Sequence, residues 1–382
     1  MRLRWVGAIA LAVACVMLWA EAGGAAPANG SVTVRRVRWA GLQMNIAGVR
    51  TGGHFIVRPA QANRSVTSIA PVTGICGGCV VAVNGDFFDF ATRQPVGGVI
   101  INGVVLRSPN PGQNQLTIGP RGRISAGYLS WTGRIVLGGM HIPVAVNDPS
   151  ATTPVIYTPR FGTATPPGRG IELRFVPHPS RALRLGKPIR LEFKGTHTPG
   201  TGFAASEVVL RATGPFATAL RQLLADRHAK PLRPTLHLRT DPRAENSLGA
   251  NHILLRGGHQ VPIDEHDSFA DGPNPRTIFA WNDRSHVKLI TIGSATPGRR
   301  AGVSLPVAAR LVQSLGMRNA VNLDGGGSST FVSYGLVRNH PSDGRPRAVA
   351  NAWVVVPRPV RHRKRAPRRA AGRARTRPAL RP

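Results

Sequence analysis

The sequence predicts an α/β protein of the mixed α+β kind, with a strand-rich mixed sheet, a few packed helices and a single large domain. Its 382 residues include 44 glycines and 33 prolines, a composition that favours many turns and short strands over a helical bundle. Short apolar or alternating runs recur along the chain, as strands require. One segment near the C-terminus has a clear helical period, which adds at least one packed helix.

Several segments carry strand patterns. Residues 29–60 alternate between apolar and polar side chains, as short strands do. Residues 80–83 form a continuous apolar run, which predicts a buried strand. Residues 97–106 are typical of a β-hairpin, with Asn102 and Gly103 forming a type I′ turn. Further strand-like runs continue to about residue 215.

Two segments carry helix patterns. Apolar positions predict a short helix over residues 216–228. A clearer helix is predicted over 304–315, because Ser304 can cap its start, Pro306 fits its first turn and Gly316 can end it. A strand over 319–323 follows. We expect the helix to pack on the sheet and this strand to bring Asp324 to its C-terminal end, where ligand sites in mixed α/β sheets are favoured.

The first 28 residues are typical of a secretory signal. A basic start is followed by an uncharged apolar run over residues 6–20 and then by small residues suited to cleavage. The apolar run is short for a membrane span, so no stable span is expected after its removal, although an uncleaved anchor is the alternative. We therefore expect a protein that is secreted or held at the cell surface.

Two cysteines, Cys76 and Cys79, remain after the signal. A CxxC pair can be half of a zinc site or a redox motif. No second CxxC and no suitably spaced histidine pair completes a zinc finger. In an exported protein the simplest interpretation is a local structural disulfide.

The chain is strongly basic, with a net charge of +33. Residues 358–382 hold eleven Lys or Arg and no acidic residue, and such a tail cannot bury enough apolar surface to fold alone. A disordered, solvated tail is the first interpretation, contact with an anionic wall polymer the second and nucleic acid the third. Nucleic acid is disfavoured because aromatic residues make up only 5% of the chain and no DNA-binding motif is visible.

The segment NLDGGGSST at residues 322–330 is the most informative motif. Asp324 ends the first strand, and three glycines permit positive φ angles and close approach of a ligand to the backbone. Successive N–H groups in such a turn can bind an anion. A carboxylate beside an anion-binding turn is a candidate hydrolytic site, although a tight hairpin with a flexible tip explains the glycines equally well.

A second apolar strand also ends in Asn, Gly and Asp, at Asn84, Gly85 and Asp86. Aspartates at such places most often cap turns, but the repetition makes Asp86 and Asp324 candidate catalytic residues. Arg276 precedes another apolar strand, and its forked guanidinium suits a phosphate. No HExxH, GxSxG or P-loop motif is present, and we assign no cofactor and no metal ligand.

Taken together, these motifs resemble the phosphodiester glycosidase family, which includes the lysosomal uncovering enzyme and bacterial exported proteins linked to exopolysaccharide. Order and spacing agree over about residues 65–356. The matching segments are AVNGDFF at 82–88, GGVIING at 97–103, PRT at 275–277, NLDGGGSST at 322–330 and RAVANA at 347–352.

The resemblance implies hydrolysis of a sugar–phosphate diester at the anomeric carbon. In this hypothesis Asp324 is the nucleophile or base, Arg276 binds the phosphate, and Asn84 and Asp86 hold sugar hydroxyls or a second acid or base proton. The remaining substrate contacts are assigned to residues of the same motifs: Gly85, Thr277, Asn322, Gly325, Gly326, Gly327, Ser328 and Ser329. The implied domain plan is N-terminal strands over 29–64, a glycosidase domain over 65–357 with a divergent insertion at 140–240, and the basic tail.

The expected partner is a sugar-phosphate or polysaccharide substrate, with an anionic wall polymer as a further contact of the tail. The alternative is a non-catalytic binding module for anionic cell-wall polysaccharide. The two hypotheses differ in one respect, because removal of residues 358–382 should abolish binding in the second and spare turnover in the first.

Overall fold

The computed structural model describes residues 31–51, 53–179, 182–226, 232–264 and 266–359. The predicted signal over 1–28 and nearly all of the predicted tail lie outside these residues. Strands dominate, with 44% of the structure in strands and 12% in helices, so the fold is largely β rather than α/β. The described helices are all too short or too polar to cross a membrane.

The described strands form four sheets. The seven-stranded sheet has the order β1 (Val32–Trp39), β2 (Leu42–Arg50), β21 (His286–Ser294), β20 (Arg276–Trp281), β22 (Asn319–Asn322), β18 (Ile253–Arg256) and β19 (His259–Gln260). A five-stranded sheet, called the β4 sheet, has the order β24 (Leu336–Val337), β23 (Phe331–Ser333), β4 (Val81–Asn84), β25 (Asn351–Pro357) and β3 (Phe55–Gln61).

The other two sheets hold the middle of the chain. The β7 sheet has the order β6 (Val104–Arg107), β5 (Val99–Ile101), β17 (Asn246–Gly249), β7 (Asn114–Ile118) and β8 (Ile124–Tyr128). The eight-stranded sheet has the order β10 (Met140–Pro143), β9 (Ser130–Leu137), β16 (Thr235–Asp241), β14 (Ile189–His197), β13 (Ile171–His178), β15 (Val208–Ala212), β12 (Val155–Tyr157) and β11 (Ala145–Val146).

Helices are few and mostly short. They are α2 (Val72–Cys76), α3 (Gly214–Ala225), α4 (Ser268–Asp271) and α5 (Leu305–Ser314), together with three single turns, η1 (Ala62–Arg64), η2 (Pro120–Gly122) and η3 (Gly326–Ser328). The two predicted helices correspond to α3 and α5. Ser304 takes the N-cap position of α5 as predicted, but its side chain makes no capping hydrogen bond.

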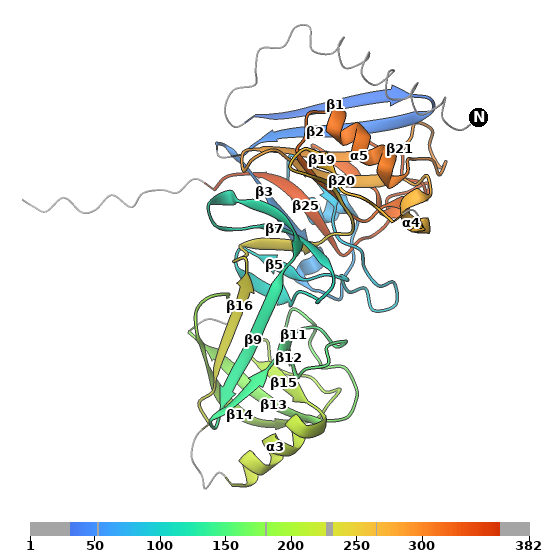
Figure 1. The fold of residues 1–382 in the computed structure, drawn as a ribbon. Helices are drawn as coiled ribbons and strands as arrows, with labels where there is room; N and C mark the ends of the chain where they lie inside the picture. The colour runs from blue at the N-terminus through green and yellow to red at the C-terminus, as the bar shows by residue number, and fades with distance from the viewer. Residues whose placement is uncertain (1–30, 52, 180–181, 227–231, 265, 360–382) are drawn as a thin grey trace, which may run out of the picture.

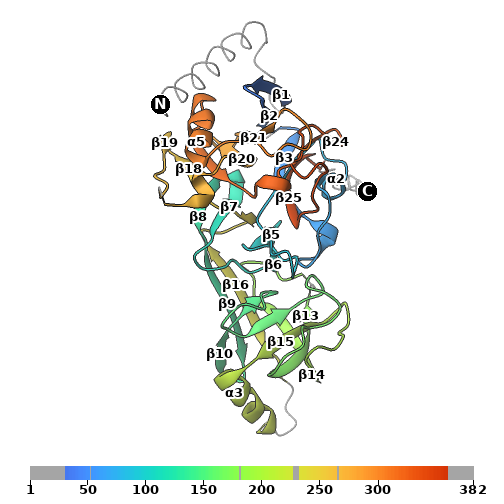
Figure 2. The same ribbon diagram turned by 90° about the vertical axis from the view of Figure 1, so that its right-hand side faces the viewer.

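The molecule has two lobes, as Figure 1 shows. The eight-stranded sheet and α3 form the lower lobe around their own apolar core, and this lobe includes most of residues 140–240. The seven-stranded and β4 sheets form the upper lobe, with α5 against the outer side of the seven-stranded sheet. The view in Figure 2 shows β5 and β6 of the β7 sheet between the two lobes.

Alternation of side chains explains this middle position of the β7 sheet. Val99 and Leu106 belong to the upper core, whereas Ile100 and Val105 belong to the lower core. Successive strand residues point to opposite faces, so an apolar hairpin can bury both faces only between two other layers. The hairpin was predicted from the sequence, and its type I′ turn is present, with φ of 52° at Asn102 and 74° at Gly103.

The strand pairing refines the mixed sheet predicted from the sequence, because only the eight-stranded sheet combines parallel and antiparallel pairs among the described strands. All pairings between the described strands are antiparallel except that of β11 with β12. The six residues of β20 are buried because α5 covers one face, including Ile278 and Ala280, and the β4 sheet covers the other, including Phe279. A strand that is covered on both faces has a continuous apolar sequence whether its neighbours are parallel or antiparallel.

One buried ion pair joins the two lobes. Arg107, at the end of β6, lies 2.8 Å from Asp148, which follows β11 in the lower lobe. The same guanidinium donates to the carbonyl oxygens of residues 95, 96 and 97. Both charged side chains are less than 10% exposed, so each depends on the other for compensation of its lost hydration.

We expect Arg107→Ala to reduce the free energy of unfolding by about 3–5 kcal/mol, because it leaves the Asp148 carboxylate buried without its cation. Chemical denaturation followed by tryptophan fluorescence measures this change. The matched control is Lys194→Ala, which removes the exposed Lys194–Glu192 pair and should cost no more than about 1 kcal/mol. Equal effects of the two substitutions would contradict the structural role of Arg107.

Candidate active site

The antiparallel register of β20 and β22 brings the candidate residues to one edge of the seven-stranded sheet. Ile278 pairs with Asn322, so the start of β20, at Arg276, and Asp324, two residues after the end of β22, lie at the same edge. The end of β4 reaches this edge from the other sheet, because the Asp324 N–H donates to the Gly85 carbonyl oxygen at 3.0 Å. The structure therefore brings together residues separated by more than two hundred positions.

A cavity of about 240 Å³ opens at this edge. Asp324, Arg276 and the three glycines of residues 325–327 line it, together with Phe269, Asn274, Arg300, Ser342, Asp343 and Arg347. Asp86 is not part of the lining and is only 1% exposed. It lies close enough to Asp324 for the two negative charges to act on each other. The candidate site thus has one carboxyl at the cavity and one buried carboxyl near it.

Asp324 is 9% exposed. Burial raises its pKa to about 6, while the Ser328 hydroxyl, the Gly325 N–H and Arg347 favour the ionised form. The Gly325 N–H donates to its Oδ1 at 2.7 Å. A carboxyl with this pKa is mostly ionised at neutral pH and can act as a nucleophile or a base.

Asp86 is held more tightly than Asp324. Its Oδ2 accepts a hydrogen bond of 2.7 Å from the Gly97 N–H, and its own N–H donates to Oδ1 of Asn351 at 2.8 Å. Its Oδ1 is buried without a hydrogen-bond partner in the described part of the chain. Burial raises the pKa of Asp86 to about 7; the Gly97 N–H and Arg107 act in the opposite direction, and Asp324 adds to the increase.

Gly249 gives the Asp86 carboxyl its space. A Cβ atom at residue 249 would lie within 2.4 Å of the carboxyl atoms of Asp86. Since real Cβ atoms do not approach so closely, a larger residue would displace the carboxyl. Gly249 ends β17, so the β7 sheet forms one wall around Asp86.

Arg276 is completely buried, and four backbone carbonyl oxygens hold its side chain, including a longer contact of 3.5 Å from Nη2 to Ala270. Its Nε donates to Val303 at 2.9 Å, and its Nη2 donates to Phe269 at 2.9 Å and to Gly272 at 2.7 Å. The guanidinium carbon lies 4.9 Å from the centre of the Phe269 ring, which adds a cation–π contact. Burial lowers its pKa to about 10, so the group stays charged at neutral pH.

One nitrogen of this buried guanidinium, Nη1, has no hydrogen-bond partner among the described residues. A buried charged donor without a partner is costly, and such groups occur mainly where function requires them. Arg276 also lines the cavity, which makes Nη1 a candidate donor to an anionic group bound there.

The glycine turn differs from the predicted anion-binding turn. The Gly326 N–H donates to Pro275, and the amides of Ser328 and Ser329 donate to carbonyl oxygens within the turn. The Gly325 N–H is occupied by Asp324. The turn has a compact 3₁₀ geometry with its own hydrogen bonds. These four amides are therefore not available for a phosphate, and for them the predicted anion-binding role is wrong. The glycines do line the cavity, as expected of substrate-contacting residues.

Asn84 and Thr277 bind each other. The Asn84 Oδ1 accepts from Thr277 Oγ1 at 2.8 Å and from the Thr330 N–H at 3.1 Å, and its Nδ2 donates to the Asp324 carbonyl oxygen at 2.7 Å. The Oγ1 of Thr277 also lies within hydrogen-bond distance of Ser329 Oγ, at 3.2 Å. In this structure these side chains hold the site together, and direct contact with a substrate stays a prediction for them.

Asn322 differs from Asn84 in its hydrogen bonding. Its side chain is completely buried, and neither its Nδ2 nor its Oδ1 has a hydrogen-bond partner among the described residues. The buried hydroxyl of Ser328 lies close enough to Asp324 to favour its ionised form, but it makes no hydrogen bond of regular geometry with the described residues. Groups of this kind gather where a ligand is bound or a chemical step occurs, which agrees with the predicted roles of both residues.

Sequence reasoning missed three residues that shape the site. Asn351 binds the backbone of both Gly85 and Asp86, Arg107 acts on the pKa of Asp86, and Arg347 acts on that of Asp324. Asn351 and Arg347 lie in the last of the matching segments and could have been selected from it. Arg107 is one of 50 basic residues and has no sequence signal of its own.

Cys76 and Cys79 form a disulfide in this structure, between α2 and the start of β4. Both cysteines are buried, and they pack with Val72, Ala82 and Val354 in one apolar cluster. The bond therefore fixes α2 against the β4 sheet, the sheet that carries Asp86.

The raised pKa of Asp86 predicts a pH-dependent gain of stability in Asp86→Asn. The wild-type protein loses stability as pH rises from about 4 to about 7, because the unfolded state ionises first and the buried carboxyl resists ionisation. The asparagine has no charge to bury and keeps an acceptor for the Gly97 N–H. We expect the variant to be more stable than wild type at pH 8, by at most about 4 kcal/mol, and the difference to vanish near pH 4.

Thermal unfolding of both proteins over this pH range measures the difference. The control is Asp89→Asn, since Asp89 is exposed on the same loop and hydrogen bonds from Thr92 lower its pKa; this variant should show no gain at high pH. A constant difference between Asp86→Asn and wild type at all pH values would contradict the raised pKa of Asp86.

One comparison with known protein families finds a match. Residues 198–356 match the family model described as phosphodiester glycosidase, a segment that contains Arg276 and Asp324. No curated protein matches the sequence significantly.

Similar solved structures show the fold. A hypothetical protein from Synechocystis aligns with a TM-score of 0.65 and 21% identity over 86% of this chain, and the alignment spans 62% of that protein. A candidate exported protein from Burkholderia pseudomallei K96243 aligns with a TM-score of 0.62 and 20% identity over 83% of this chain and 74% of its own.

A third structure is more distant. The catalytic domain of zebrafish N-acetylglucosamine-1-phosphodiester alpha-N-acetylglucosaminidase aligns with a TM-score of 0.43 and 15% identity, over 88% of this chain and 86% of its own. The family match includes the arginine, the aspartate and the glycine turn of the cavity. Residues 198–356 are therefore similar in sequence to the phosphodiester glycosidase family.

Proposed function

We propose that the protein is an exported glycoside hydrolase that cleaves the phosphodiester link between the anomeric carbon of a sugar and a phosphate, in cell-surface or exopolysaccharide metabolism. One observation carries the proposal. A small cavity is lined by a carboxyl whose pKa is about 6 and by a buried guanidinium with a nitrogen left without a partner. A glycosyl phosphodiester offers one group for each of these, an electrophilic carbon for the carboxylate and an anion for the arginine.

In the reaction, water adds to the anomeric carbon and the bond from this carbon to the phosphate oxygen breaks. The sugar leaves with a new hydroxyl group, the other proton of the water passes to the carboxylate that acts as base, and the phosphate leaves as a monoester that keeps the bridging oxygen and its electron pair. Phosphate is a good leaving group, so the main need is stabilisation of the positive charge at the anomeric carbon. Asp324 supplies the negative charge for that carbon, and Arg276 supplies a positive charge for the departing phosphate.

The two carboxyls differ in their proposed roles. Three groups favour ionised Asp324, namely Ser328, the Gly325 N–H and Arg347, and Asp324 is the carboxyl that lines the cavity. Asp86 has the higher pKa and stays protonated when Asp324 is already charged. We assign Asp324 the role of nucleophile or base, and Asp86 that of the second proton-holding group.

Asp324→Asn tests the proposal on a panel of UDP-sugars and sugar-1-phosphate esters. The wild-type protein should release free sugar and a phosphomonoester, and the variant should lose about 10³-fold or more in kcat. The matched control is Asp343→Asn, because Asp343 lines the same cavity but forms an exposed ion pair with Arg347. We expect the control to change kcat by less than about tenfold. Undiminished turnover in a folded Asp324→Asn protein would contradict the assignment of Asp324 as nucleophile or base.

The pH profile tests the division of roles. If Asp324 acts ionised and Asp86 acts protonated, kcat/KM rises through about pH 6 and falls above about pH 7. In Asp86→Asn the fall at high pH should disappear, whatever the absolute rate, because the group that loses its proton is gone. A wild-type profile that stays flat from pH 6 to pH 9 would show that Asp86 does not act as a protonated group.

The alternative function is a binding module for anionic cell-wall polysaccharide. A second cleft, lined by five arginines, favours binding of such a polymer. A folded protein that binds the polymer but releases neither sugar nor phosphomonoester from any substrate would favour this alternative.

A further inference from the structure

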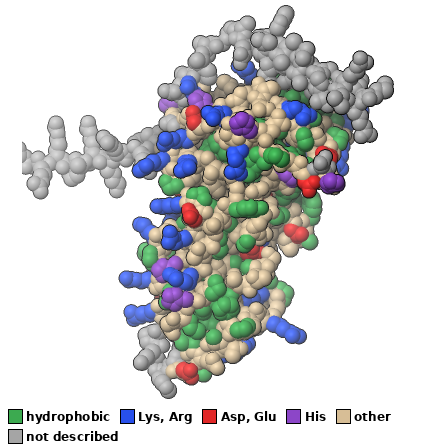
Figure 3. Space-filling view, in the orientation of Figure 1, with side chains coloured by type: hydrophobic (Ala, Val, Ile, Leu, Met, Phe, Trp, Pro, Cys, Tyr) green, Lys and Arg blue, Asp and Glu red, His purple; other side chains and the backbone are tan. Residues whose placement is uncertain are grey.

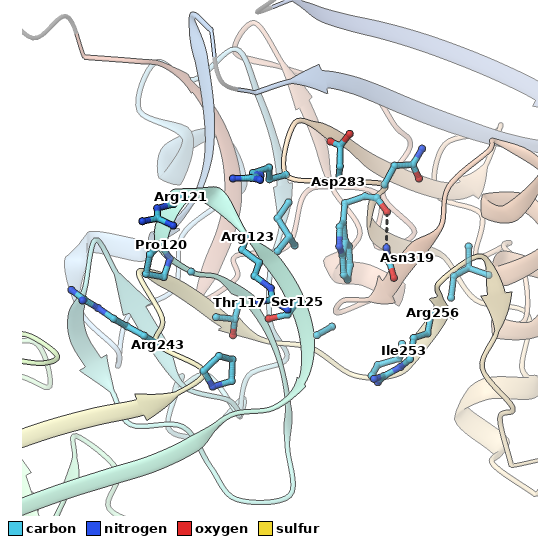
Figure 4. Close-up of a pocket in the computed structure, with 18 residues that line it drawn as sticks. Thr117, Pro120, Arg121, Arg123, Ser125, Arg243, Ile253, Arg256, Asp283 and Asn319 are labelled. Atoms are coloured by element: carbon cyan, nitrogen blue, oxygen red, sulfur yellow. Dashed lines mark hydrogen bonds between the residues drawn. The ribbon is translucent and has the colours of Figure 1, made fainter.

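A second and larger cleft lies away from the candidate active site. It has a volume of about 990 Å³, large enough for several sugar rings. One wall is formed by the β7–β8 hairpin with its η2 turn and by Arg243 after β16. The other wall is formed by β18 and by residues 281–284, between β20 and β21. Figure 4 shows Arg121, Arg123 and Arg243 on one side of the cleft and Arg256 on the other.

The lining of this cleft is strongly basic. It contains five arginines, Arg121, Arg123, Arg243, Arg256 and Arg284, and a single acidic residue, Asp283. The Asp283 carboxylate is already used, since it accepts hydrogen bonds from the backbone N–H groups of Ser285 and His286. The face in Figure 3 likewise carries many basic side chains and few acidic ones.

The five guanidinium groups have no partner of their own. All five residues are exposed, and within the described ranges none of the five side chains makes an ion pair or a hydrogen bond. Five like charges around one hollow repel one another, which is unfavourable unless an anion is bound there. The forked guanidinium groups suit phosphate or carboxylate oxygens, which they can bind in pairs.

The floor of the cleft suits a sugar chain better than a nucleic acid. It combines apolar side chains, Ile253 and Leu255, with polar ones such as Thr117, Ser125 and Asn319. Trp281 is the one aromatic residue in the lining, and it is only 6% exposed, so it offers no face for stacking a base. Sites for single-stranded nucleic acid use exposed aromatic side chains for this purpose.

The cleft and the catalytic cavity lie at opposite ends of the same two strands. Arg276 starts β20 at the cavity and Trp281 ends it at the cleft, while β22 begins at Asn319 in the cleft and leads to Asp324. Five residue steps along a strand span roughly 17 Å. A single sugar phosphate in the cavity cannot reach the cleft, whereas a polymer of several units can contact both.

We propose that this cleft is an anion-binding site for an extended phosphodiester-linked glycan, which the arginines hold while the catalytic cavity acts on the same class of polymer. The choice of phosphodiester groups rests on the proposed function, and the binding of an anionic glycan rests on the cleft alone. The site would increase the affinity for polymers and leave the hydrolysis of small substrates unchanged.

Binding is measured with a bacterial phosphoglycan of glycosyl-1-phosphate repeats, on the Asp324→Asn background so that the polymer is not consumed. The test variant combines Arg121→Gln, Arg243→Gln and Arg256→Gln, which alter both walls. The matched control combines Arg35→Gln, Arg169→Gln and Arg299→Gln, which remove the same charge from exposed positions elsewhere. Exposed substitutions of this kind change stability little, and thermal unfolding verifies that both variants are folded.

We expect the cleft variant to bind the phosphoglycan at least about tenfold more weakly than the control, and the difference to shrink as salt is raised. Turnover of a small sugar-1-phosphate ester by the two charge variants, with Asp324 intact, should agree within about twofold. Dextran, alginate and a single-stranded oligonucleotide complete the comparison, and each should bind more weakly than the phosphoglycan.

Equal binding by the cleft variant and the control would overturn the site. So would an absence of phosphoglycan binding, or tighter binding of the oligonucleotide, which would assign the cleft to nucleic acid. Equal affinity for alginate would overturn the choice of phosphate. Failure of all turnover with phosphoglycan binding intact would contradict the proposed function and leave the cleft assignment standing, so the two can fail separately.

Discussion

The side chain of Asn84 is the junction on which the site depends. It binds three separate segments at once, Thr277 at the start of β20, Thr330 after the glycine turn and the backbone of Asp324. The amide lies at the end of β4, so these bonds join the β4 sheet to the seven-stranded sheet at their common edge. A buried amide has four hydrogen-bonding positions, and Asn84 uses three of them on the elements that carry the candidate catalytic groups. The distance between Asp86 and Asp324 is therefore set by the packing of two sheets rather than by a flexible loop.

The same packing opposes the ionisation of both carboxyls. Two largely buried aspartates, close enough to act on each other and with the buried Arg107 acting on Asp86, form a costly arrangement that apolar residues would avoid. Such costs are typical of active sites, where the shifted pKa is itself the functional property. The stability lost at the site is compensated by the rest of the fold, in which four sheets and the large apolar clusters bury most of the apolar side chains.

Much of this architecture could be predicted from the sequence, and the failures have physical causes. The buried strand before Asp86, the helix before Asp324 and the turn at Asn102 depend on local patterns that tertiary structure did not override. Strand direction could not be predicted, because β20 is covered on both faces and its apolar run has no period that distinguishes parallel from antiparallel neighbours. Four amides of the predicted anion cradle are already used within the protein, which could not be predicted for a related reason, since a glycine turn does not reveal which of its amides bind residues such as Pro275, far away in the sequence.

The position of β25 has a consequence for how the protein is made. Asn351, which holds the backbone of Asp86, starts this strand, and β25 lies between β3 and β4 in the β4 sheet. In this sheet β3, residues 55–61, pairs with β25, residues 351–357, so β3 has no neighbouring strand in the sheet until β25 has been synthesised. Contacts so distant in sequence form slowly, because a long loop must close before any pairing compensates for the lost entropy. The site consequently cannot assemble while most of the chain is being synthesised. Asp86 and Asp324 therefore come together only after the whole domain has left the ribosome.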